Sequence, residues 1–120
     1  MNKSEAIARA SKRDGAAGLD SGTTHFANVN SSKRVWWLDI PLEEIKPVGD
    51  ENINLLLYDG RSDQLHHLRV PTAFLRDNRQ RLAARSDKKC ISLELSADAG
   101  NRFTDVRPTG QGVRFDQFSL

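Results

Sequence analysis

The sequence has a single cysteine and no long apolar run, and both absences limit what the protein can be. Cys90 has no second cysteine to pair with, so a disulfide within the chain is excluded. No ten consecutive residues are all apolar, so we expect neither a membrane-spanning helix nor a secretory signal peptide. These features predict a protein of the reducing cytoplasm that does not contact membranes.

The sequence also lacks the short motifs that mark common enzymes and metal sites. It contains no G-x-S-x-G, no H-E-x-x-H and no phosphate-binding glycine loop. His66 and His67 are neighbours in a predicted strand, so their side chains point to opposite faces and cannot ligate one metal ion. We therefore predict no catalytic residue, no metal and no cofactor. A small hydrolase that uses His67 and Asp105 ranks third among our hypotheses for the function, after a nucleic-acid-binding module and a protein-interaction adaptor.

A β-hairpin is the clearest predicted element. Residues 53–58 form an apolar run that ends in a cluster of turn-forming residues, and residues 64–70 can return as the second strand. The alternation of side chains in this second strand places His66, Leu68 and Val70 on the core face.

An amphipathic helix is predicted to follow the hairpin, over residues 71–84. Pro71 suits the first helical turn, because its missing N–H would have no partner there. The apolar stripe, about 100° wide, consists of Pro71, Phe74, Leu75, Asn78 and Leu82. Arg76 and Arg79 fall on the opposite side, which predicts that they face solvent.

Three further strands are predicted. Residues 35–40 alternate so that Trp36 is buried and Trp37 faces outward, where a partner or another segment can cover it. Residues 90–95 alternate between apolar and polar side chains, which predicts one buried and one solvated face. A last edge strand is expected at residues 113–115.

These elements predict an α+β fold. We expect an antiparallel-dominated sheet of four or five strands with the 71–84 helix packed on one face, all within a single small domain at residues 35–120. Residues 1–34 show no hydrophobic period, so we expect them to form a flexible, disordered, basic tail.

The charges are unevenly distributed along the chain. Residues 39–63 carry seven acidic and two basic side chains, whereas residues 69–89 carry seven basic and two acidic ones. Because arginine-rich surfaces suit phosphates, we predict a non-catalytic binding module with nucleic acid as the leading ligand. The predicted contact residues are Arg76, Arg79, Arg81, Lys88, Lys89, Lys33 and Arg34. The alternative is a protein-interaction adaptor or a self-associating domain that uses the bipolar surface and Trp37.

Overall fold

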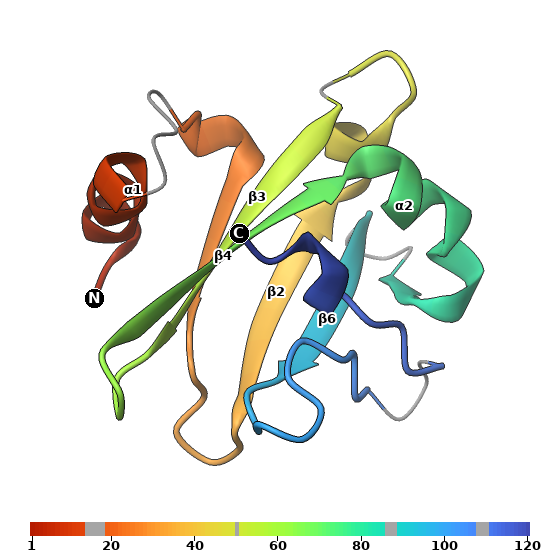
Figure 1. Cartoon of the computed structure of the whole chain (residues 1–120). Coiled ribbons are helices and arrows are strands. Elements are labelled where there is room, and N and C mark those ends of the chain that lie inside the picture. The colour runs from red at the N-terminus through yellow and green to blue at the C-terminus, as the bar shows by residue number, and fades with distance from the viewer. Residues whose placement is uncertain (14–18, 50, 86–88, 108–110) are drawn as a thin grey trace.

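The protein has the predicted α+β fold, with its strands divided between two three-stranded sheets (Figure 1). The computed structural model describes residues 1–13, 19–49, 51–85, 89–107 and 111–120. The elements in chain order are α1 (Lys3–Arg13), η1 (Ser21–Thr23), β1 (Thr24–Asn28), β2 (Val35–Pro41), η2 (Leu42–Ile45), β3 (Asn52–Asp59), β4 (Gln64–Pro71), α2 (Thr72–Asp77), η3 (Arg79–Arg81), β5 (Ala83–Arg85), β6 (Cys90–Ser96) and η4 (Asp116–Phe118). Over these described ranges, none of the helices has the length and apolarity needed to cross a membrane.

The first sheet, which we call sheet A, has the strand order β1-β3-β4. β3 and β4 pair antiparallel, from Asn52 opposite Pro71 to Asp59 opposite Gln64, which confirms the predicted hairpin. Asp63, rather than the glycine of the turn, takes the left-handed conformation with φ of 53°. Aspartate tolerates this region better than most residues with a side chain.

The second sheet, sheet B, has the order β2-β6-β5 and is antiparallel throughout. The prediction that one face of residues 90–95 is solvated is wrong for β6, because Ser92, Glu94 and Ser96 are all buried. β6 is the central strand of its sheet: β2 covers one edge, while β5 and a bridge from Leu95 to Asp105 cover the other.

The main core lies between the two sheets. Its largest fully buried members are Trp36, Ile40, Ile53, Leu55, Leu57, Leu68, Leu75, Ile91, Leu93, Leu95 and Phe115. Trp36 is fully buried, as predicted, and its Nε1 donates a hydrogen bond to the backbone oxygen of Tyr58 at 3.0 Å. This bond ties β2 of sheet B to β3 of sheet A. His66 is half-buried and packs edge-on against Trp36 and Phe103, with ring centroids 5.5 and 5.2 Å away.

The expectation of a disordered tail at residues 1–34 is wrong for the described part of that segment. β1 joins sheet A as a parallel neighbour of β3. α1 contacts all three strands of sheet A and covers the face that points away from the main core. Ala6 and Ala10 pack there against Leu56 and Leu65. Small alanines let the helix approach the sheet closely, so few large apolar residues are needed.

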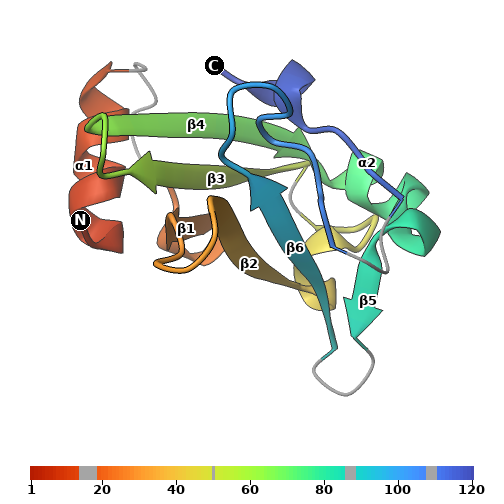
Figure 2. The same cartoon turned by 90° about the horizontal axis from the view of Figure 1, so that it is seen from below.

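The predicted helix at 71–84 is shorter than expected, because α2 ends at Asp77. Asn78 ends it: both its backbone N–H and its side-chain Nδ2 donate to the backbone oxygen of Phe74, at 3.1 and 2.9 Å. The chain then forms η3 and turns into β5, which pairs with β6. α2 packs against η2 and the end of β4, at the opposite end of the molecule from α1 (Figures 1 and 2).

Candidate functional site

The arginines predicted to line the helix have different roles. Arg76 is half-buried, and its Nη1 donates to the backbone oxygen of Ile45 at 2.9 Å and to Thr72 Oγ1 at 3.1 Å. It therefore joins α2 to η2, a structural role that its predicted position on the solvent face did not suggest. Arg79 and Arg81 lie on η3 and are exposed.

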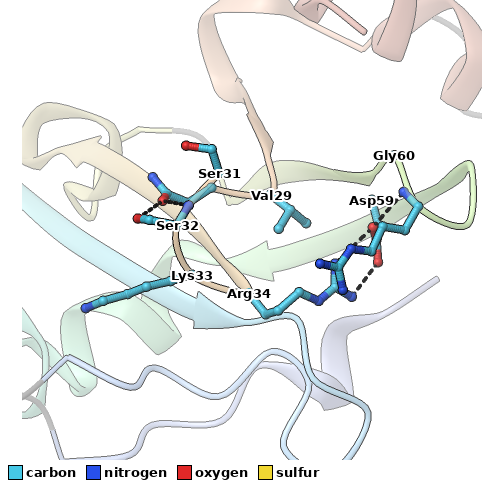
Figure 3. A pocket seen from close by; sticks show the side chains of 9 residues that line it. Val29, Ser31, Ser32, Lys33, Arg34, Asp59 and Gly60 are labelled. Carbon is cyan, nitrogen blue, oxygen red and sulfur yellow. Dashed lines mark hydrogen bonds and ion pairs between the residues drawn. The ribbon is translucent and has the colours of Figure 1, made fainter.

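Lys33 and Arg34 lie in the β1–β2 loop, which forms one wall of a concavity of about 380 Å³ (Figure 3). The turn after β3 forms the other wall. Arg34 Nη1 and Nη2 donate to the two carboxylate oxygens of Asp59 at 3.1 and 2.7 Å. The Arg34 guanidinium holds the pKa of Asp59 below its usual range. Lys33 points away from Arg34 in Figure 3, so the two cations do not converge on one ligand.

The first part of the predicted basic tail, α1, lies far from the predicted basic helix. α1 and α2 lie at opposite ends of the molecule in both views (Figures 1 and 2). Two of the basic residues of α1 also bind the protein itself: Arg9 pairs with Asp63 at 3.0 Å, and Arg13 donates to the backbone oxygen of Leu65 at 2.6 Å. Of the remaining predicted contacts, Lys89 is exposed between β5 and β6, and Lys88 lies outside the described residues.

Two arginines that sequence reasoning missed, Arg102 and Arg114, lie together near the C-terminus. They line a concavity of about 460 Å³. Arg114 also lines a second concavity, of about 260 Å³, together with Arg81. Because Arg114 belongs to both, the two hollows adjoin each other. We call Arg81, Arg114 and Arg102 the arginine row.

Backbone hydrogen bonds hold the three segments of the arginine row side by side. The backbone N–H of Gln111 donates to the oxygen of Arg81 at 3.2 Å. Arg114 forms a β-bridge with Thr104, and the N–H of Phe115 donates to the oxygen of Phe103 at 3.0 Å. These bonds fix the backbone positions from which the three arginine side chains project.

The arginine row carries positive charge with little compensation. Within the described residues its ion pair is that of Arg114 with Asp116 at 3.2 Å, between side chains that are 72 % and 47 % exposed, so the pair is weak. Nε of Arg102 is buried and has no hydrogen-bond partner within the described ranges. Burial and the charge of Arg102 also lower the pKa of His66, which favours the neutral imidazole. An anionic ligand would satisfy the donors of this row.

The groups considered for hydrolysis are held apart from each other. His67 lies on the outer face of sheet A, where Nε2 is 2.8 Å from Asn54 Oδ1. Asp105 is buried beside β6, and its Oδ1 accepts a hydrogen bond from the backbone N–H of Glu94 at 3.1 Å. Burial raises the pKa of the Asp105 carboxyl. The two residues lie on different sheets, so they do not form an acid–base pair.

Comparison of the chain with protein-family models, with curated proteins and with solved structures finds no match.

Proposed function

We propose that the protein is a non-catalytic nucleic-acid-binding module whose arginine row contacts the phosphate backbone. The observation that supports this most is the position of Arg114 between two adjoining hollows, with Arg81 on one side and Arg102 on the other. Three guanidinium groups along one surface suit a polyanion better than a single small anion, because each can bind a separate phosphate.

The choice of arginine also supports phosphate as the recognised group. A guanidinium presents paired N–H donors that match two phosphate oxygens, and it stays charged at any physiological pH. The lone thiol, Cys90, is buried and free, which is compatible with our expectation of a reducing cytoplasm.

Fluorescence anisotropy with labelled oligonucleotides tests this proposal through the variant Arg114→Glu. At about 50 mM salt, where charges are weakly screened, the variant should bind about tenfold or more weakly than the wild type. Three phosphate contacts predict a slope of log K against log salt of about −2 to −3, and the variant should reduce its magnitude by about one.

Lys12→Glu is the matched control for this experiment. It makes the same change of charge at an exposed position of α1, at the opposite end of the molecule from α2. It should leave the affinity nearly unchanged. Equal losses in both variants would show that only net charge matters, and no binding by the wild type at high micromolar concentration would end the proposal.

A further inference from the structure

A groove of about 400 Å³ on sheet B has no part in the arginine row. It is lined by Trp37 together with Lys33, Asp39, Ser92, Glu94 and Arg107, and we call it the Trp37 groove. Trp37 is 53 % exposed, whereas its neighbour Trp36 is fully buried. An indole ring offers a large apolar face. Leaving about half of the Trp37 side chain in water loses the stabilising free energy that its burial would contribute.

The pairing of β2 with β6 determines what surrounds the Trp37 ring. Trp37 lies opposite Glu94, and Asp39 lies opposite Ser92. Because side chains alternate along a strand, these four residues project from the same face of sheet B. The hydroxyl of Ser92 donates to Asp39 Oδ1 at 2.5 Å, which orients that carboxylate.

Two cations complete the Trp37 groove. Lys33 Nζ is 3.6 Å from Glu94 Oε1, and its side chain is 63 % exposed, so this contact is loose enough to be exchanged. Nε of Arg107 is buried and, among the described residues, has no hydrogen-bond partner. The groove thus combines an aromatic platform, two cations and an oriented carboxylate.

We propose that the Trp37 groove binds one unpaired base of a single-stranded nucleic acid, with the base stacked on Trp37. Lys33 and Arg107 contact the flanking phosphates. Asp39 accepts a hydrogen bond from an exocyclic amino group of the base. This inference rests on the proposed function and deepens it, because it names the single strand rather than the duplex as the ligand.

Several features of the groove favour a single strand. Aromatic side chains on a sheet can stack on bases only when those bases are not already stacked in a duplex. Asp39 and Glu94 repel phosphates, so a ligand must turn a base, and not its backbone, toward them. Carboxylates accept hydrogen bonds from amino groups such as cytosine N4, which gives the pair of acids a role in recognition.

The Trp37 groove and the arginine row can bind the same strand. Thr104 lines the hollow that contains Arg102 and Arg114, and Arg107 lines the Trp37 groove. Thr104 and Arg107 are three positions apart in the chain, so their Cα atoms lie at most about 11 Å from each other. The segment that contains Thr104 and Arg107 therefore borders both the arginine row and the Trp37 groove.

The test compares a fluorescein-labelled oligodeoxycytidine with an abasic strand of the same length and the same number of phosphates. The wild type should bind the strand with bases between about 5- and 100-fold more tightly, as expected for stacking of one base. Trp37→Ala should bind both strands equally, with the affinity that the wild type has for the abasic strand. Trp37→Phe should restore part of the preference, and Val48→Ala, which alters another exposed apolar residue, should change nothing.

A comparison of strands with different bases tests the role of Asp39. Oligothymidine has no amino group, so the wild type should bind it more weakly than oligodeoxycytidine. Asp39→Ala should remove this difference while keeping the preference for strands with bases. Equal affinity of the wild type for the two homopolymers would overturn the hydrogen bond assigned to Asp39.

The failure of this inference can be distinguished from the failure of the proposed function. One outcome is that the wild type binds abasic and normal strands equally while Arg114→Glu still weakens the binding of both. In that case the proposed stacking on Trp37 is wrong and the proposed phosphate binding stands. If Trp37→Ala weakens both strands to the same extent, the stacking is also wrong. If the wild type binds neither strand, both proposals fall and the groove becomes a candidate surface for a protein partner.

Discussion

The ion pair between Arg34 and Asp59 joins the β1–β2 loop to the end of β3. Both oxygens of the carboxylate are used by the guanidinium, and Oδ1 also accepts the backbone N–H of Arg61 at 3.1 Å. Asp59 is 6 % exposed, so the charge is held mostly away from water. A buried carboxylate that loses its partner is costly, which makes this pair a structural feature of the loops.

Replacement of Asp59 by asparagine should lower the free energy of unfolding by about 1 to 3 kcal/mol at pH 7. The pKa of Asp59 is lowered in the folded protein, chiefly by its bonds to Arg34. Its contribution to stability is therefore present above the unfolded pKa of about 3.9 and is lost as the pH falls through the folded pKa. Urea titrations of the wild type and of Asp59→Asn at pH 7 and near pH 3 measure this effect. The difference between their free energies of unfolding should be smaller near pH 3 than at pH 7.

Asp77→Asn is the control for this comparison, because Asp77 is exposed at the end of α2. It should change the free energy of unfolding by less than about 0.5 kcal/mol at either pH. A loss equal to that of Asp59→Asn would mean that net charge, and not the ion pair, sets the pH dependence.

At the residue scale, the sequence predicts burial better than it predicts partners. Alternation in residues 35–40 correctly places Trp36 inside and Trp37 outside. It does not reveal that Arg34 is held by Asp59, because that contact depends on where two loops meet. The outward direction of the Arg114 side chain could be predicted locally, because it lies between the apolar residues Val113 and Phe115, which are buried. Its position beside Arg102 and Arg81 has no such signal.

At the scale of elements, α1 shows how a helix can pack on a sheet with small residues. Ala10 is fully buried against Leu56 and Leu65, whereas Ala8 lies on the exposed side of the same helix. Ala10→Leu should therefore overpack this contact and lower the free energy of unfolding by about 1 to 3 kcal/mol. Ala8→Leu should leave it nearly unchanged. Urea denaturation of the two variants measures the difference, and equal stabilities would mean that α1 does not pack on sheet A in solution.

Local signals predict some elements of this chain and miss others. The β3–β4 hairpin is predicted because turn-forming residues separate two apolar runs only a few positions apart. The end of α2 is missed because residues 79–84 have a helical pattern, and the pairing of β5 with β6 overrides it. Asn78, a polar residue within the predicted apolar stripe, was the local sign that the helix stops there. β1 and α1 are missed because their apolar side chains are few and show no clear hydrophobic period.

At the scale of the whole molecule, the division into two sheets depends on contacts between distant segments. β1 pairs with β3 at a separation of 30 residues, and β2 pairs with β6 at separations of 49 to 61 residues. No local pattern specifies which strand is the neighbour of which. The sequence therefore predicts the α+β class and most strands, but not their arrangement or the surfaces that the arrangement creates.

The pairing of β2 with β6 also has a consequence for the order in which the molecule folds. The segment between these strands contains the β3–β4 hairpin and α2, so closing the pair means closing a long loop around elements whose backbone hydrogen bonds are local. Loop closure costs more entropy as the loop lengthens, and distant pairings slow folding. Pulsed hydrogen exchange during refolding should therefore protect the amides of β3 and β4 before those of β2 and β6. The Trp37 groove, which is built largely from β2 and β6, would then be among the last surfaces to form, and a newly made chain would acquire its hairpin before this groove.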